Sequence, residues 1–189
     1  MKRLNKKGFT LIELLAVIVI LAVLLAIAIP NVSKYINSSK KQTYIVDVKN
    51  YLKAAKQETI SNGKYQLPVN KNDAVIITFK ALEKAIESGG ETSPYGGAID
   101  KNSSFIMIVN TDSADDPTYA FYIAAIDGKG YGIGKSSNGT SSAEAIEEKL
   151  LKEENIIQLG IGNGINPDQV DQAVIDGVIT PINRVEVYK

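Results

Sequence analysis

The hydrophobic pattern divides the chain into an unbroken apolar run, an amphipathic segment and a longer mixed region. The apolar run extends from Phe9 to Ile29, and no polar residue interrupts it after Glu13. A helix of about 21 residues spans ~31 Å, the thickness of the hydrocarbon core of a bilayer. A helix that is apolar on all sides lies in lipid or inside protein. We therefore expect residues 9–29 to form a transmembrane helix.

The pattern becomes amphipathic after Pro30. One long helix is predicted over residues 9–62, kinked at Pro30 because proline removes a backbone donor, and Gly63 is a natural stop. The second half, residues 30–62, is expected to bury one face under a globular head of residues 63–189. Its apolar residues recur at steps of three or four, with some gaps, at Val32, Ile36, Ile45, Val48, Leu52, Ala55 and Ile60.

The region from residue 63 onward alternates short apolar runs with turn residues, which favours an antiparallel sheet. Thr78 is expected to cap a helix over residues 79–88, and residues 93–97 to form a turn that leads into the sheet. Residues 127–130 are expected to close a hairpin. Strands are predicted over residues 75–78, 105–110, 119–126, 131–133 and 185–188.

Two further helices are predicted in the last third of the chain. Residues 135–142 are rich in Ser, Gly and Asn and are interpreted as an exposed loop. Ser141 and Glu144 then form a capping box for a helix over residues 143–154, and a shorter helix runs from Asn166 to near Gly177. The fold class is α+β: a long N-terminal helix packed on an antiparallel sheet, with extra short helices.

The composition excludes several kinds of site. Cysteine and histidine are absent, which excludes disulfides, Cys/His metal sites, cysteine nucleophiles and Ser-His-Asp triads. Lys+Arg and Asp+Glu each number 21, so the formal net charge is zero and gives no indication of a nucleic-acid partner. We expect no enzymatic activity, no cofactor and no metal.

Charge is concentrated before the apolar run. Positive charge on the cytoplasmic side fixes the orientation of a membrane helix, so the N-terminus is expected in the cytoplasm and the head outside. Glu13 lies within the run, where a carboxylate at the bilayer centre costs about 2.5–3.5 kcal/mol and is normally paired or functional. The alternative is a carboxylate that reaches the headgroups. The four positive residues before the run are Lys2, Arg3, Lys6 and Lys7.

Three fates of the apolar run compete. The run is an uncleaved anchor, a secretory signal cut after Ala28, or a helix kept in the mature protein after cleavage at Gly8. Ala26-Ile27-Ala28 matches the small-x-small pattern of a secretory signal, but it lies inside the run and Pro30 follows closely. Pro beyond a scissile bond makes a poor peptidase substrate, and Glu13 is unusual in such a signal.

The segment from Lys6 to Leu14 resembles the class III signal of type IV pilins and pseudopilins. That pattern has a short basic leader ending in Gly, then Phe, three mostly apolar residues, Glu and a long apolar helix, which Gly8, Phe9 and Glu13 match. Pro30 lies where these subunits often carry a kinking proline. The resemblance covers residues 1 to about 62 and implies the pilin fold.

The resemblance also implies processing and assembly. A membrane-embedded prepilin peptidase would remove the leader, residues 1–8, and Phe9 would be N-methylated. Glu13 of an incoming subunit would pair with the Phe9 amine of a subunit already in the filament. The implied partners are copies of the same chain, the prepilin peptidase, the assembly platform with its ATPase-driven machinery, and membrane lipid before assembly. The implied locations are the cell membrane and then an extracellular pilus.

Several functions remain open at this stage. A pilin with roles in adhesion, twitching motility or biofilm is preferred, and a pseudopilin of a type II secretion or competence system is the alternative. A function of another class is that of a monomeric, membrane-anchored surface binding protein.

Three motifs are weighed and set aside. Gly130–Ser136 resembles a phosphate loop but has Lys129 where the first glycine is required. Residues 160–164 lack the strand-turn-helix context of a dinucleotide site. Residues 110–116 offer oxygens for calcium, but their spacing is not that of an EF-hand, and a solvated loop is preferred. The lysines of residues 40–56 are interpreted as a solvated helix face.

Overall fold

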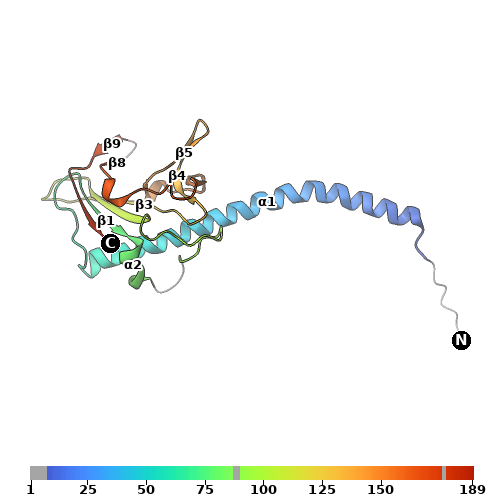
Figure 1. Ribbon diagram of the computed structural model, residues 1–189, viewed down its shortest axis with the longest axis horizontal. Helices are drawn as coiled ribbons and strands as arrows, with labels where there is room; N and C mark the ends of the chain where they lie inside the picture. Colours follow the sequence, from blue (N-terminus) through green and yellow to red (C-terminus); the bar gives the residue numbers. More distant parts are fainter. Residues whose placement is uncertain (1–7, 87–89, 176–177) are drawn as a thin grey trace. The chain divides into compact units, whose positions relative to one another are not determined.

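The computed structural model describes residues 8–86, 90–175 and 178–189. It divides into two compact units, residues 1–39 and Lys40–Lys189. The second is called the head unit below, and each unit is described on its own. The predicted long helix is confirmed: α1 (Leu11–Lys56) belongs to both units and continues into a π turn, Gln57–Ser61 (Figure 1).

The predicted sheet is present in the head unit, and it has five strands. Its order is β10-β1-β2-β3-β6, in which β10 runs parallel to β1 and every other neighbouring pair is antiparallel. The register places Ile77 opposite Ile106, and Ile106 opposite Ile123. The strands are β10 (Arg184–Tyr188), β1 (Asp73–Thr78), β2 (Phe105–Asn110), β3 (Tyr119–Ala124) and β6 (Ile146–Glu147).

One face of this sheet packs against the second half of α1. Tyr44, Val48, Tyr51, Leu52 and Ala55 of the helix are buried in one cluster with the inward side chains of the strands. Their spacing of three and four residues places them on one helix face. The main contribution to stability is the apolar surface removed from water, about 25 cal/mol per Å².

The other face of the sheet is covered by the C-terminal part of the chain. There β8 (Gln172–Ile175) and β9 (Val178–Pro181) form a hairpin, and Ala173 is buried against Ile76, Phe105 and Met107 of the sheet. Because both faces of the sheet are covered, all six residues of β2 are buried. This explains why β2 is almost continuously apolar rather than alternating.

A second sheet has the order β5-β4-β7, formed by β5 (Thr140–Ala143), β4 (Tyr131–Ser137) and β7 (Ile156–Gln158). Two glycines of β4 allow neighbouring backbone segments to lie very close to this strand. A Cβ at Gly132 would overlap the carbonyl oxygen of Ala125, and one at Gly134 that of Ser142. The glycine-rich sequence that resembles a phosphate loop is therefore the β4 strand.

The expected hairpin of residues 127–130 is present as a tight turn, because Asp127 N donates to Tyr131 O at 2.8 Å and Gly130 N donates to Asp127 O at 2.9 Å. However, β4 then leaves the main sheet for the second one. The prediction that residues 131–133 join the same antiparallel sheet as the preceding strands is therefore wrong.

The predictions for residues 135–154 are only partly right. Residues 135–142 are exposed as predicted, but they largely form the β4–β5 hairpin rather than an irregular loop. Ser141 pairs with Ser136 in that hairpin, and Glu144 forms an ion pair with Lys135 at 2.8 Å. In place of a helix over residues 143–154 there are β6 and two short 3-10 turns, Glu148–Leu150 and Glu153–Asn155. Pairing with the edge of β3 overrides the helical propensity of this segment.

Two other predicted helices are much shorter than expected. Thr78 caps α2 as predicted, with its hydroxyl accepting from Ala81 N, but α2 is only Phe79–Leu82, followed by the 3-10 turn Glu83–Ala85. Asn166 caps a single 3-10 turn, Pro167–Gln169, and the chain then becomes β8. The predicted helix to Gly177 is wrong, and Gly177 itself lies outside the described residues. The predicted closing strand is confirmed as β10.

Candidate assembly site

The apolar rod, Phe9–Ile29, exposes its large apolar side chains to the surroundings within this chain. Phe9 is 84% exposed and Leu11 86%, and the other large side chains along the rod remain about half exposed or more. This helix is long and apolar enough to cross a membrane. Apolar surface of this extent requires lipid or other apolar helices around it.

Glu13 is held at the start of α1 by Thr10. The backbone N and the hydroxyl of Thr10 donate to Glu13 Oε2 at 2.9 and 2.8 Å, and Glu13 N donates to Thr10 Oγ1 at 3.3 Å. This reciprocal arrangement is a capping box, which provides partners for backbone donors that the first turn of a helix leaves free. The acid also lies near the positive end of the helix dipole.

The sequence prediction missed the role of Thr10. A threonine three residues before a glutamate at the start of an apolar run is the sequence pattern of a capping box. The roles predicted for Glu13 concern its cost in lipid and its pairing with the Phe9 amine, and its capping contact with Thr10 is a finding of the structure. The structure joins the two residues, so Thr10 is part of the candidate site.

The predicted processing residues Gly8 and Phe9 both lie on the surface just before α1. A side chain added at Gly8 would find no atom of this chain within 4 Å. Any need for glycine there comes from outside the folded chain, as in a narrow peptidase site. Lys6 and Lys7 lie outside the described residues. Cleavage and methylation remain predictions.

Pro30 lies inside α1, and the chain stays helical through it. Proline leaves a carbonyl of the preceding turn without its usual donor. Next to it, Asn31 Nδ2 donates to Ile27 O at 3.1 Å, which supplies a side-chain donor to the same turn. A kink at Pro30 remains a prediction.

The N-terminal end of α1 within the head unit is joined to the sheets by tyrosines. Tyr44 OH donates to Tyr131 O at 3.2 Å. The Tyr131 ring is stacked on Tyr95 with centroids 3.8 Å apart, and Lys40 Nζ lies 5.5 Å from the Tyr95 centroid. Burial raises the pKa of Tyr44, and nearby Asp127 raises it further.

A mid-helix contact adds to this connection. Tyr51 is stacked on Phe79 with centroids 3.8 Å apart, and its hydroxyl donates to Gly90 O at 3.1 Å. Burial raises the pKa of Tyr51 as well. Aromatic pairs of this kind stabilise beyond their buried area by about 0.5–1.5 kcal/mol. The second half of α1 is therefore a structural part of the head unit.

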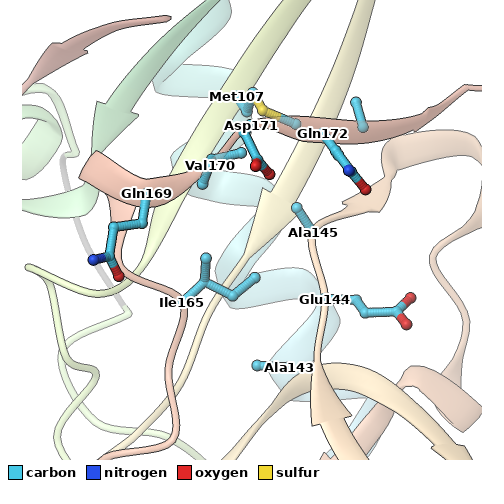
Figure 2. Close-up of a pocket in the computed structure, with 10 residues that line it drawn as sticks. Met107, Ala143, Glu144, Ala145, Ile165, Gln169, Val170, Asp171 and Gln172 are labelled. Atoms are coloured by element: carbon cyan, nitrogen blue, oxygen red, sulfur yellow. The ribbon is translucent and has the colours of Figure 1, made fainter. Parts of the chain in front are cut away.

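A groove of about 250 Å³ lies on the face of the main sheet that is turned away from α1. Met107 of β2 lines it, and Figure 2 shows Ala143 to Ala145 on one side and Ile165 and Val170 on the other. The side chains of Glu144 and Gln172 point away from Ile165. Among the described residues that line it, none is a nucleophile with a neighbouring base.

The other weighed motifs carry no recognisable site. Within the described residues, no group of three or more Asp or Glu side chains is placed to hold a metal ion, and this includes the loop of residues 110–116. Residues 160–164 form a turn in which Asn163 N donates to Gly160 O at 3.3 Å.

The start of the chain is similar to a known family. A family model described as the prokaryotic N-terminal methylation motif matches residues 3–29. The chain carries this motif. The resemblance to type IV pilins and pseudopilins is thereby confirmed at the N-terminus, and the α+β fold with a long N-terminal helix agrees with it.

Two curated proteins are similar over a short segment. One is the "ComG operon protein 3 homolog" of Bacillus licheniformis, 51% identical over 39 residues. Another is the "Competence protein ComGC" of Bacillus subtilis strain 168, 49% identical over 39 residues. Each alignment covers 21% of this chain and 40% of the relative. No solved structure matches the chain significantly.

Proposed function

We propose that this chain is a structural subunit of an extracellular filament of the type IV pilus class, and that it acts by assembly rather than as an enzyme. The observation that carries the proposal is the apolar rod, exposed along its length and bearing the methylation motif. Its helix continues into the head unit and forms part of that unit's core. Such a rod can exchange lipid neighbours for copies of itself without entering water.

In this proposal the precursor is a single-pass membrane protein with its N-terminus in the cytoplasm. A prepilin peptidase cuts after Gly8, and Phe9 then carries a new, methylated amine. That amine and the Glu13 carboxylate are opposite charges that are both costly in an apolar environment. Pairing them between neighbouring subunits removes both costs and fixes the axial register.

Thr10 gives Glu13 a partner before assembly. The capping box satisfies one carboxylate oxygen within the chain and leaves the other, Oε1, for an incoming amine. Membrane lipid surrounds the rod at this stage, and an assembly platform with its ATPase would lift the subunit out. The mature filament would lie outside the cell.

A competence pseudopilin is the second candidate, and the names of the two relatives favour it. Adhesion, twitching motility and biofilm formation would follow from the first candidate, and DNA uptake or secretion from the second. Deletion of the gene, followed by assays of transformation and of surface motility, separates them. Loss of transformation with intact motility would favour the pseudopilin.

The N-terminus of the protein purified from cells provides the main test. Mass spectrometry is expected to find a chain that begins with methylated Phe9, and fibres sheared from the cells are expected to contain it. A chain that begins with Met1, or at Ile29, with no fibres would contradict the proposal and favour a monomeric surface binding protein or a secreted one.

Glu13→Ala tests the assembly step separately. Processing at Gly8 is expected to continue while the amount of chain in sheared fibres falls. Glu154→Ala, an exposed glutamate of the head unit, is the matched control and should assemble normally. Normal fibres from the Glu13 variant would refute the proposed pairing.

A further inference from the structure

The face of α1 that the head unit leaves uncovered carries both lysines and large apolar side chains. In this unit the helix buries the face of Tyr44, Val48 and Tyr51. At 100° per residue, the residues on the opposite side form one continuous stripe. We call this stripe the outer face of α1; it consists of Val46, Lys49, Asn50 and Lys53, and it is continued by Gln57 and Ile60 of the π turn that follows, all exposed.

The outer face is both basic and apolar. Val46 is 59% exposed and Ile60 60%, and Lys49 and Lys53 lie between them. Neither lysine takes part in an ion pair within the described part of the chain. Asp47 is the only acid between Lys34 and Lys56. The face therefore carries unpaired positive charge beside uncovered apolar side chains.

The complementary charge lies in the β2–β3 loop, residues 111–118. Asp112, Asp115 and Asp116 are all exposed there, and no lysine or arginine occurs from Phe105 to Gly128. Across the described residues none of these three aspartates has an ion-pair partner. Several other carboxylates at the surface are already paired with lysines, the exposed Glu83 and Asp168 and the partly buried Glu144 and Glu148.

The loop cannot reach the outer face of α1 within one molecule. It joins β2 to β3, whose side chains pack against the buried side of the helix. Lys56 Nζ, for example, lies 4.6 Å from the centroid of the Phe121 ring of β3. A contact between loop and outer face must therefore join two copies. When the contact runs in one direction only, from the loop of one copy to the outer face of the next, it is heterologous, and it produces an open polymer if the rotation between copies does not close a ring.

We infer that the outer face of α1 binds the β2–β3 loop of a second copy of this chain. This inference rests on the proposed filament function and specifies how neighbouring head units meet. Lys49 and Lys53 face Asp115 and Asp116, while Val46, one turn before Lys49, loses water against Ala114, the apolar residue next to Asp115. Because the charged pairs are exposed, the contact weakens as ionic strength rises.

Charge reversal and exchange test the pairing. Lys49→Glu with Lys53→Glu should lower the amount of chain in sheared fibres by about 5- to 30-fold, with processing at Gly8 unchanged. Adding Asp115→Lys and Asp116→Lys to the same chain should restore fibres. Lys80→Glu with Lys84→Glu makes the same change of charge on another exposed surface and should leave fibres intact.

Cysteine cross-linking gives a second measurement, since the chain has no cysteine of its own. Cells that express one copy with Lys49→Cys and another with Asp115→Cys should give an oxidant-dependent dimer, because a disulfide needs Cα atoms within about 7 Å. Asp168→Cys replaces Asp115→Cys in the control pair and should give none.

The outcomes separate this inference from the proposed function. Wild-type cells without fibres would refute the filament itself. Wild-type fibres, with equally abundant fibres from the Lys49/Lys53 reversal, would overturn the inference alone. Reversed chains that lose fibres without rescue by the exchange, and that give no cross-link, would also overturn it, provided that resistance to protease shows the head unit to be folded.

Discussion

Asp127 is a buried carboxylate at which two turns of the head unit meet, and its replacement by alanine should strongly destabilise that unit. The side chain is 2% exposed. Its Oδ1 accepts from Lys129 N at 2.8 Å and Tyr131 N at 2.9 Å, and its Oδ2 accepts from the hydroxyl of Ser93. Asp127 therefore ties the turn of residues 93–97 to the turn before β4.

The size of the effect follows from these three bonds. Hydrogen bonds to a charged group contribute about 1.5–3 kcal/mol each, partly offset by the cost of burying the carboxylate. We expect Asp127→Ala to lower the free energy of unfolding by about 3–5 kcal/mol, a large share of the ~5–15 kcal/mol typical of a domain. Asp127→Asn keeps Oδ1 as an acceptor for both backbone donors and should cost only about 1–2 kcal/mol.

These differences can be measured by denaturing the full chain in detergent and monitoring the near-UV circular dichroism of its tyrosines. The chain has no tryptophan, so the near-UV signal comes mainly from tyrosine. For a unit of this size the alanine variant should melt about 6–20 °C below the wild type. Asp168→Ala, which removes an exposed aspartate paired with Lys189 at 2.6 Å, is the control and should cost less than about 1 kcal/mol. Equal losses for alanine and asparagine at position 127 would refute the reasoning from acceptor geometry.

Two further predictions concern the head unit. Gly130→Ala should destabilise it by about 2–4 kcal/mol in a urea titration, because φ is +80° and the new Cβ would lie 2.5 Å from the carbonyl carbon of Gly160. Gly139→Ala, with φ +78° but no atom within 4 Å, should cost only about 1–2 kcal/mol, and equal costs would contradict the steric argument. Burial raises the pKa of Asp47, because the charged carboxylate is less favourable in the folded state than in the unfolded chain. The stability of the head unit therefore falls as the pH rises from the unfolded pKa of about 3.9 through the folded pKa. Asp47→Asn should therefore raise stability at pH 7, by less than about 1 kcal/mol because the group is only partly buried. The gain should vanish below about pH 4, and a gain independent of pH would contradict this cause.

The first part of the candidate site could be predicted because its pattern is local. The apolar rod, Glu13 at a fixed distance from Phe9 and the start of α1 all lie within one continuous segment. Helix periodicity and the cost of a charge in lipid act on neighbouring residues, so both can be inferred without knowledge of the fold. Thr10 is equally local, because its capping pattern with Glu13 spans only three residues.

The C-terminal third shows where local inference fails. Residues 143–154 are rich in residues that favour helices, yet Ile146 lies opposite Ile123 at the edge of β3. Ile146 is 6% exposed there and Leu151 8%. The apolar surface buried in these positions outweighs a propensity difference of at most about 0.7 kcal/mol per residue. A short strand edge of this kind leaves no periodic signal in the sequence.

The sequence by itself determined the membrane-length rod, its acid, the methylation motif and the amphipathic helix that follows. Only the tertiary structure decided how the head unit uses its polar and charged residues. Asp127 meets Ser93 across 34 positions of sequence, and the outer face of α1 is defined by which side of the helix the sheet covers. The physical reason is that periodicity records the environment of a single element, whereas hydrogen bonds and exposed faces depend on which distant elements pack together.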